Sequence, residues 1–429
     1  MGRLYNRREQ AVRITDLRCI HIPSLRALIL RIDTDDGIYG LSQVEMNKHA
    51  YLAPQILHYK QFIAGLDPTD VENVMRRIRR LGAFKPWGAA VSSIEIALWD
   101  IAGKAARLPV HKLLGGKVRD RVRVYMGGGP PFAASPPYRA GGDRPEDYYN
   151  RTVARKQRAN GIAIMKTAVA FHDERWRAVA EHHYGIAQPQ THPESSAGLA
   201  PSSLAESAGM VTEQGLGHAV ECVAAVKEAL GGDIAMALDC GPGWKVPGAI
   251  AFARRVEHLQ PLWLEDLVTG DYTPYVNAEL YREVKRHTAA PLHTGEQIYL
   301  RHNFKELIET RAVDVIGPDP MDVGGLAELK WIAEYADLHG ILMAPHGIGD
   351  GPFGLAALVQ VCATLPDNYL AFELPIVGAQ WKGLVTGLGE DAVQDGFIPV
   401  PEAPGLGIDL VQDEVRRVLG TDDIYVNCS

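Results

Sequence analysis

Ile234-Ala-Met-Ala-Leu-Asp239, Pro261-Leu-Trp-Leu-Glu265 and Ala289-Ala-Pro-Leu-His-Thr-Gly-Glu296 are three apolar runs that each end on a carboxylate. Runs of this kind, separated by helix-like segments, are typical of buried parallel strands. The acids are 26 and 31 positions apart, which is about one strand-helix repeat of a (β/α)₈ barrel of roughly 200 to 250 residues. Each acid is therefore expected at the C-terminal end of its own strand, on the face where such barrels build active sites.

Asp239, Glu265 and Glu296 are predicted to hold a divalent cation. Three converging carboxylates repel one another and lose solvation when they are buried, so a hard cation is their natural partner. Mg²⁺ fits oxygen ligands of this kind. A single acid at a strand end is more often a solvated loop residue or a helix cap, and the succession of three is what favours a metal site.

The composition of the whole chain is that of an ordinary globular protein. It has 429 residues, of which 46% are hydrophobic and 22% are charged, and its net charge of −8 gives no electrostatic footprint for nucleic acid. No apolar run is long enough to cross a bilayer, and the N-terminus lacks the apolar region of a secretory signal, so we expect a cytoplasmic protein. The five cysteines are scattered and form no CxxC motif, which is typical of reduced structural thiols.

The first part of the chain is predicted to form an α+β domain that ends near residue 120. Residues 14–22 and 26–33 have the pattern of strands in an antiparallel meander. Helical patterns follow at 68–81 and 89–106, where apolar residues recur every three or four positions.

From residue 121 the pattern becomes strand, helix, strand. Eight strands are expected to end near Tyr125, Lys166, Asp239, Glu265, Glu296, Asp319, His346 and Glu373. The predicted helices cover 145–159, 217–230, 247–259, 280–287, 303–310, 326–339 and 354–363. We place a barrel at 121–384, with an insertion at 188–209 that is expected to form a lid or an oligomer contact, or to be disordered. The tail, 385–429, is expected to pack on the N-terminal domain.

Several motifs resemble one known family when they are taken as a set. They are Ala97-Leu-Trp-Asp-Ile-Ala-Gly-Lys104, Trp263-Leu-Glu-Asp266, Gly295-Glu-Gln297 and Pro318-Asp-Pro-Met-Asp-Val-Gly-Gly325. The chain resembles the enolase superfamily, in the mandelate racemase subgroup. The resemblance implies an α/β fold, with a (β/α)₈ TIM-like barrel and an N-terminal α+β capping domain completed by the C-terminal tail. It also implies that the three acids bind Mg²⁺ together with a substrate carboxylate.

His346 is the candidate general base. It follows Met343-Ala-Pro at the end of the seventh strand, and Asp319 at the end of the sixth could accept a hydrogen bond from one of its ring nitrogens. The other nitrogen would then face the substrate. A lone histidine before glycine is more often a hydrogen-bonded loop residue, but the Asp-His pair matches the dyad of the subgroup.

Glu373 and Lys166 are the other candidate catalytic residues. Glu373 resembles the electrophilic glutamate of the subgroup and could donate a hydrogen bond to the substrate carboxylate if apolar neighbours keep it protonated; the alternative is an ordinary acid on the barrel rim. Lys166 aligns with the first lysine of a Lys-x-Lys motif found in many relatives, and Ala168 stands where the second would be. Lys166 either lowers the electrostatic cost of placing the substrate carboxylate in the site or is a plain cation on the barrel rim.

The missing second lysine favours a reaction that needs one base. The chain resembles acid-sugar dehydratases such as the galactonate and mannonate types, which implies a Mg²⁺-dependent carbon-oxygen lyase acting on an aldonate or aldarate. His346 would take the α-proton, a metal-stabilised ene-diolate would form, and loss of the β-hydroxyl would give a 2-keto-3-deoxy acid. Protonated His346 could itself be the acid in a syn elimination. Some of these dehydratases place a histidine acid just after Asp239, where this chain has none, so the general acid and the specific sugar acid stay open.

Two other functions remain compatible with the sequence. One is an epimerase, racemase or cycloisomerase in which Lys166 or a residue of the insertion is the second base. The other is a metal-binding sensor that has lost catalysis. The expected partners are a small-molecule acid sugar and further copies of the chain in an even-numbered homo-oligomer, with no nucleic acid and no membrane.

Overall fold

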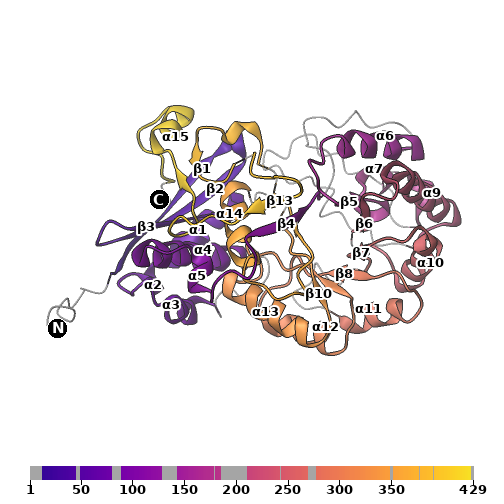
Figure 1. Ribbon diagram of the computed structural model, residues 1–429, viewed down its shortest axis with the longest axis horizontal. Helices are drawn as coiled ribbons and strands as arrows, with labels where there is room; N and C mark the ends of the chain where they lie inside the picture. Colours follow the sequence, from indigo (N-terminus) through magenta and orange to yellow (C-terminus); the bar gives the residue numbers. More distant parts are fainter. Residues whose placement is uncertain are drawn as a thin grey trace.

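The chain forms two groups of elements (Figure 1). The N-terminal group is an antiparallel sheet with helices packed on it, and the second, longer group is a series of parallel strands with helices around them. The computed structural model describes residues 12–44, 49–79, 88–127, 143–177, 179–184, 210–241, 243–268, 277–347, 351–375, 377–389 and 391–426. Within these ranges, no helix has both the length and the apolar composition needed to cross a membrane.

The N-terminal sheet is the predicted antiparallel meander, in the order β1-β2-β3. Its elements are β1 (Ile14–Ile22), η1 (Pro23–Leu25), β2 (Ala27–Thr34), β3 (Tyr39–Val44), α1 (His49–His58), α2 (Lys60–Ile63), α3 (Val71–Ile78), α4 (Gly88–Ala106) and α5 (Val110–Leu113). β3 lies directly on α4, since a Cβ atom at Gly40 would stand 2.0 Å from the carbonyl oxygen of Ala97. The predicted helix at 68–81 begins only at Val71, because Asp67 accepts a hydrogen bond from the backbone N–H of Thr69 and forms a turn there.

The parallel strands follow one another in sequence order. They are β4 (Arg121–Tyr125), β5 (Ile164–Ala168), β6 (Ala235–Asp239), β7 (Trp263–Glu265), β8 (Leu292–Thr294), β9 (Val315–Ile316), β10 (Leu342–Met343) and β11 (Phe372–Glu373). β5 to β10 form one six-stranded sheet, and β4 pairs in parallel with β11. Isolated parallel bridges join Met126 to Met165 and Met343 to Tyr369. One continuous sheet therefore covers six of the eight predicted strands, the other two pair with each other, and closure of the barrel stays a prediction.

Helices lie between consecutive parallel strands and on the outside of the sheet (Figure 1). The longer ones are α6 (Pro145–Lys156), α9 (Glu213–Leu230), α10 (Val246–Val256), α11 (Ala278–Lys285), α12 (Arg301–Glu309), α13 (Leu326–Leu338) and α14 (Gly351–Cys362). Shorter turns of helix are η3 (Ala170–His172), α7 (Glu174–Arg177), η4 (Ala180–His182) and η5 (Glu257–Leu259). The predicted insertion at 188–209 lies outside the described residues.

A small buried cluster lies between the parallel strands and takes one residue from, or directly beside, each of the eight strands except β8. Its members are Tyr125, Ile164, Ala237, Trp263, Val315, Ala344 and Ala371. The rings of Trp263 and Tyr125 meet edge to face with their centroids 5.3 Å apart. The strands from β4 to β11 therefore share one interior.

β9 and β10 are shorter than the sequence pattern suggests. β9 ends at Ile316 and β10 at Met343, and in each case a proline follows two positions later, at Pro318 and Pro345. Proline has no N–H to offer a ladder, so the strand pairing stops. As a result, the candidate residues that follow these prolines lie on loops just past the strand ends.

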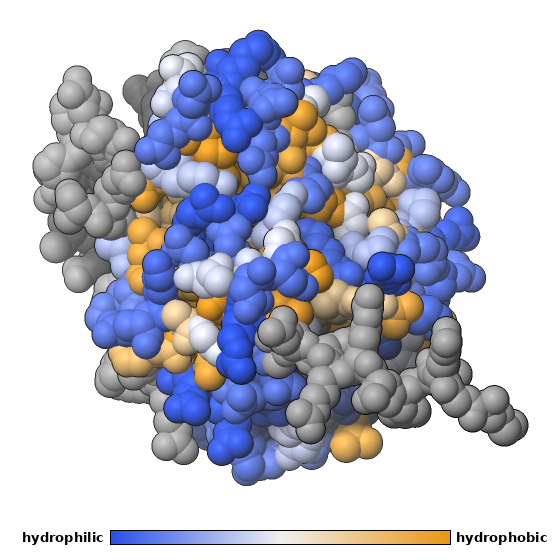
Figure 2. All heavy atoms as spheres, turned by 90° about the vertical axis from the view of Figure 1, so that its left-hand side faces the viewer, coloured by the Kyte–Doolittle hydropathy of each residue, from blue (hydrophilic) through white to orange (hydrophobic). Residues whose placement is uncertain are grey.

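The C-terminal tail contacts both groups of elements. It contains β12 (Val385–Thr386), β13 (Phe397–Pro399), β14 (Asp409–Leu410) and α15 (Gln412–Leu419), and η7 (Ala379–Trp381) lies just ahead of it. β13 pairs antiparallel with β4, whereas the N–H of Val110 donates to the carbonyl of Gly405 and the hydroxyl of Tyr39 donates to Asp409. On the face that the N-terminal elements form, hydrophobic residues appear in separate patches between hydrophilic ones (Figure 2). The tail packs on the N-terminal elements, while the domain boundaries at 120 and 384 stay predictions.

Candidate active site

Lys166 lies among three carboxylates at the ends of neighbouring strands. Its Nζ atom is 2.6 Å from Oε1 of Glu265, 3.3 Å from Oε1 of Glu373 and 3.4 Å from Oδ2 of Asp239. Burial alone would lower the pKa of Lys166, but the charges of Glu265 and Glu373 raise it well above its ordinary value. Lys166 is 1% exposed, so it is buried among these acids and does not lie on an exposed rim; its role stays a prediction.

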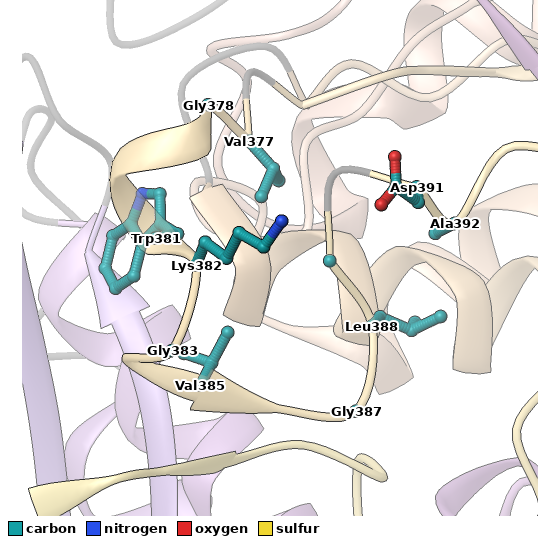
Figure 3. A pocket seen from close by; sticks show the side chains of 11 residues that line it. Val377, Gly378, Trp381, Lys382, Gly383, Val385, Gly387, Leu388, Asp391 and Ala392 are labelled. Carbon is teal, nitrogen blue, oxygen red and sulfur yellow. The ribbon is translucent and has the colours of Figure 1, made fainter. Parts of the chain in front are cut away.

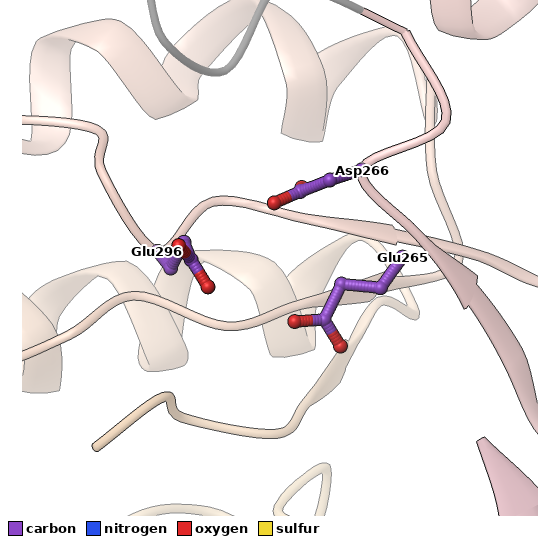
Figure 4. A group of neighbouring side chains, drawn as sticks. All are labelled: Glu265, Asp266 and Glu296. Carbon is purple, nitrogen blue, oxygen red and sulfur yellow. The ribbon is translucent and has the colours of Figure 1, made fainter. Parts of the chain in front are cut away.

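Glu265, Asp266 and Glu296 form a group of carboxylates that could hold a metal ion (Figure 4). One oxygen from each lies within 4.8 Å of the others. Asp239, which we predicted as a ligand, is not part of this group; its carboxylate lies 3.4 Å from Nζ of Lys166 and 3.2 Å from Nδ1 of His172. The structure therefore brings together two of the three predicted ligands and adds Asp266.

The position of Asp266 is not evident from a strand pattern. Successive residues of a strand face opposite sides, so Asp266 should point away from Glu265. Instead, it has a φ of +52°, a conformation that aspartate adopts more readily than most residues, and β7 ends before it. The hydroxyl of Thr294 donates to its Oδ1 atom at 2.8 Å. In the sequence, the only indication that Asp266 belongs to the site is that it is a second acid directly after Glu265.

Burial disfavours the ionised form of the acids in this group, whereas nearby cations favour it. Burial raises the pKa of Glu265 to about 8, although the charge of Lys166 opposes the rise. Burial also favours neutral Glu296, but the charges of His346, Lys166 and His172 together lower its pKa to about 2. Buried oxygen donors in this number fit a hard divalent cation such as Mg²⁺, which would favour the ionised form of each carboxylate.

His346 and Asp319 form the predicted pair. Nδ1 of His346 lies 2.6 Å from Oδ2 of Asp319, and the other carboxylate oxygen of Asp319 accepts the backbone N–H of Met321 at 2.7 Å. Nε2 of His346 faces the acids, 3.3 Å from Glu296 and 3.4 Å from Glu373. Burial alone would lower the pKa of His346, but these carboxylates raise it well above its ordinary value. Burial raises the pKa of Asp319 to about 6, although His346 opposes the rise.

Glu373 is completely buried between Lys166 and His346. Gly127, two residues past the end of β4, makes room for it, because a Cβ atom there would lie 1.6 Å from Oε1 of Glu373. The burial excludes the alternative of an exposed acid on the rim. Its role as a hydrogen-bond donor to a substrate stays a prediction.

His293, three residues before Glu296, lies beneath the site and supports Glu265. Its ring stacks on that of Trp263 with a centroid distance of 5.2 Å, and its Nδ1 atom is 3.4 Å from Oε2 of Glu265. The indole N–H of Trp263 donates to the same oxygen at 2.9 Å. Burial lowers the pKa of His293 to about 3, so the ring is neutral and packs between the parallel strands.

His172 is a site residue that sequence reasoning missed. It ends η3, four positions after Ala168, where the second lysine of relatives would stand. Nothing in its neighbourhood in sequence indicates a contact with Asp239, because the two residues come from different strand-helix units.

A separate pocket of about 340 Å³ lies where the C-terminal tail begins (Figure 3). Residues between 377 and 392 line it, among them Trp381, Lys382 and Asp391. It contains none of the candidate catalytic residues.

Two protein-domain families match parts of this chain. Residues 19–115 match the N-terminal domain of the mandelate racemase / muconate lactonizing enzyme family, and residues 159–414 match the enolase C-terminal domain-like family. Together they span both groups of elements and most of the tail.

Three similar proteins show what the whole chain resembles. The D-galactonate dehydratase of Ralstonia pickettii (strain 12J) is 27% identical over 408 residues, which cover 93% of this chain and 92% of the relative. The D-xylonate dehydratase of Haloferax volcanii is 30% identical over 405 residues, which cover 91% of this chain and 84% of the relative. The crystal structure of a mandelate racemase/muconate lactonizing enzyme-like protein from Rubrobacter xylanophilus has a TM-score of 0.77 and 30% identity, and the match covers 95% of this chain and 97% of the other.

Proposed function

Because this chain belongs to the mandelate racemase / muconate lactonizing enzyme family of the enolase superfamily and is a hydro-lyase, we propose that it converts a sugar acid to a 2-keto-3-deoxy acid. The names of the relatives, D-galactonate and D-xylonate dehydratase, support an aldonate as the substrate class. The observation that carries the proposal is an imidazole held by a buried carboxylate on one side and facing a cluster of acids on the other.

The acid cluster would hold Mg²⁺ through Glu265, Glu296 and a third carboxylate, either Asp239 or Asp266. When bound, such a cation stabilises the negative charge that develops on a substrate carboxylate as its α-proton leaves. The donor set supports this part of the proposal, because all of the ligand atoms are carboxylate oxygens. In the set that includes Asp266, one oxygen from each residue lies within 4.8 Å of the others, and two of the three residues are buried.

The residues of the chain have distinct roles in the proton transfer. Nε2 of His346 takes the α-proton, and Asp319 fixes the orientation of the ring through Nδ1 and stabilises its protonated form. Lys166 stays protonated because its pKa is raised, so it serves as a buried positive charge beside the substrate carboxylate. Glu373 lies between these two groups and is placed to meet the same carboxylate.

The closed eight-stranded barrel belongs to the same proposal. Its support is the pairing of β4 with β11, the two isolated bridges that join the remaining neighbours, and the shared interior cluster. The boundaries at 120 and 384, and assembly as a homo-oligomer, complete it.

The direct test is turnover of a panel of aldonic and aldaric acids in the presence of Mg²⁺, with the α-keto acid product detected as its semicarbazone. We expect at least one acid to be dehydrated, and His346→Asn to lose both dehydration and exchange of the α-proton with deuterium from the solvent. If the wild-type protein binds metal but turns over no member of the panel, the proposal fails.

Epimerisation or cycloisomerisation is distinguished in the same experiment, because the α-proton would exchange without loss of water. Lys166 is a poor candidate for the second base, because three carboxylates engage its buried ammonium group. A sensor without catalysis would show a ligand-induced rise in melting temperature with neither exchange nor product.

A further inference from the structure

His172 is built into the candidate site on the side away from His346. Its Nδ1 atom lies 3.2 Å from Oδ1 of Asp239, and its side chain is 38% exposed, in contrast to Asp239, which is 7% exposed. With Nδ1 on Asp239, Nε2 is the ring nitrogen that can meet a substrate. The imidazole of His172 therefore contacts a buried acid on one side and is partly exposed on the other.

Two glycines give the segment that carries His172 its position. A Cβ atom at Gly241 would lie 2.6 Å from Cβ of His172 and 2.7 Å from its Nδ1 atom, and a Cβ atom at Gly243 would lie 2.7 Å from the ring of Phe171. Gly241 has a φ of +58°, which glycine adopts at no steric cost. The loop after Asp239 therefore leaves room for an imidazole supplied by the loop after β5.

Aromatic packing holds the same segment in place. The ring of Phe171 packs edge to face on Trp176 and on Trp244, each with a centroid distance of 5.0 Å. In addition, the N–H of Val169 donates to the carbonyl of Asp239 at 2.8 Å. These contacts fix the position of the segment that carries His172.

His172 and His346 stand at the two ends of one row of charged groups. From His172 the row runs to Asp239, then to Lys166 at 3.4 Å, to Glu373 at 3.3 Å and to Nε2 of His346 at 3.4 Å. The two imidazoles come from loops after β5 and β10, at the two edges of the six-stranded sheet. A substrate bound over this row would have one imidazole on each side.

We propose that His172 is the catalytic residue that protonates the leaving β-hydroxyl, an inference that rests on the proposed dehydration. His346 takes the proton from Cα, the electron pair of that C–H bond forms the Cα–Cβ double bond, and the Cβ–O bond breaks as its oxygen takes a proton from Nε2 of His172 and leaves as water. The resulting enol becomes the keto acid when Cβ accepts the proton held by His346 and the enol hydroxyl releases its proton to His172. Both imidazoles then hold the protons with which they began.

This assignment separates the acid from the base. A single imidazole that both takes and returns the proton can serve only a leaving group on its own side of the substrate, whereas two imidazoles on opposite sides permit an anti elimination. Lys166 is a weaker candidate for the acid, because three carboxylates already engage its buried ammonium group.

The test compares His172→Asn and His172→Gln with the wild-type protein on an acid sugar that the wild type dehydrates. We expect dehydration to fall by ~10² to 10⁴-fold, the usual contribution of a general acid, while the α-proton still exchanges with deuterium at a rate within about tenfold of the wild type. An analogue with fluoride in place of the β-hydroxyl should be eliminated by both variants at nearly the wild-type rate, because fluoride leaves without a proton.

His258→Asn is the matched control, since His258 is an exposed histidine in η5 on the chain ahead of β7, and it should change none of these rates. The rise in melting temperature on addition of Mg²⁺, measured for every variant, shows whether the fold and the acid cluster are intact. Two outcomes would overturn the role of His172 but not the proposed function. One is a dehydration rate within several-fold of the wild type in both His172 variants, and the other is an equal loss of dehydration, proton exchange and fluoride elimination. Absence of dehydration and exchange in the wild type itself would instead overturn the proposed function and this inference with it.

Discussion

Lys166 shows how one side chain can set the electrostatics of a buried site. Its ammonium group is the positive charge closest to Glu265 and also lies within 3.4 Å of Glu373 and Asp239. Pairing of this kind compensates for the cost of removing the carboxylates from water. Since the acids outnumber it, Lys166 reduces the excess of negative charge near a bound cation without removing it.

Lys166→Met should therefore destabilise the protein when metal is removed. We expect the free energy of unfolding in EDTA to fall by about 3 to 5 kcal/mol, the cost of leaving buried charges without their partner. Mg²⁺ should raise the melting temperature of this variant more than that of the wild type, because the cation then supplies the missing positive charge. Urea unfolding and thermal melts with and without Mg²⁺ measure both effects.

The control for this prediction is Lys305→Met. Lys305 is 63% exposed on α12 and pairs with Glu309 at 2.7 Å, and exposed pairs contribute only about 0 to 1 kcal/mol. Equal effects of the two lysine substitutions would show that the Lys166 cluster is not the source of the stability.

At the scale of elements, α4 of the N-terminal group caps α13 among the parallel strands. Oε2 of Glu95 accepts the N–H of Leu326 at 2.8 Å, and Oε1 accepts the N–H of Ala327 at 3.0 Å and the indole N–H of Trp99 at 2.7 Å. These backbone groups have no partner within their own helix. Because α13 follows the loop that carries Asp319, the N-terminal helix supports the loop with the partner of the candidate base.

The buried carboxyl of Glu95 should make stability depend on pH. Burial raises its pKa from 4.5 to about 7, although these N–H groups oppose the rise. Between about pH 4.5 and pH 7, the unfolded chain releases this proton while the folded chain keeps it, so the contribution of Glu95 to stability falls as the pH rises and is constant above about pH 7. The decrease is about 3 kcal/mol at most.

Glu95→Gln removes this titration. Relative to the variant, the wild-type protein should lose up to about 3 kcal/mol of unfolding free energy between pH 4.5 and pH 7.5, measured by urea unfolding at several pH values. The comparison between the two proteins cancels the titration of all other groups. A difference that stays the same at every pH would contradict the prediction.

At the scale of the whole molecule, Asp100 ties three distant parts of the chain together. It is completely buried on α4, where its Oδ2 atom accepts the N–H of Leu41 at 3.0 Å and the ammonium of Lys104 at 2.6 Å. Its Oδ1 atom accepts the N–H of Leu406 in the C-terminal tail at 2.9 Å. The tail therefore closes on the N-terminal sheet through one carboxylate.

Asp100→Ala should be among the more destabilising single substitutions. It leaves two buried N–H groups without their acceptor and removes the carboxylate that pairs with Lys104, whose ammonium group keeps only the carbonyl of Tyr39 at 3.1 Å and Asp409 at 3.9 Å. We therefore expect a loss of about 3 to 5 kcal/mol in the free energy of unfolding. Asp413→Ala is the matched control, because Asp413 is 90% exposed in its ion pair with Arg416 on α15 and should cost less than about 1 kcal/mol. Urea unfolding of both variants tests the prediction, which is wrong if their losses are similar.

The sequence by itself determined the order of the strands, the placement of helices between them and the meeting of His346 with Asp319. These follow from local patterns, since apolar runs and helical spacing define the elements, and the carboxyl ends of neighbouring parallel strands meet at one edge. The roles assigned to the site residues stay proposals, but the proximity of this pair needed no knowledge beyond two consecutive strand ends.

Only the tertiary structure decided which side chains surround the acids. Asp266 turns toward Glu296 through a positive φ, Lys166 is buried among carboxylates from three other strands, and His172 reaches Asp239 over Gly241. None of these contacts has a local signature, because each depends on how closely two loops or strands approach across the sheet. The chain therefore encodes its strand-helix repeat within short windows of sequence, whereas the composition of its candidate site emerges only when residues from separate windows are packed together.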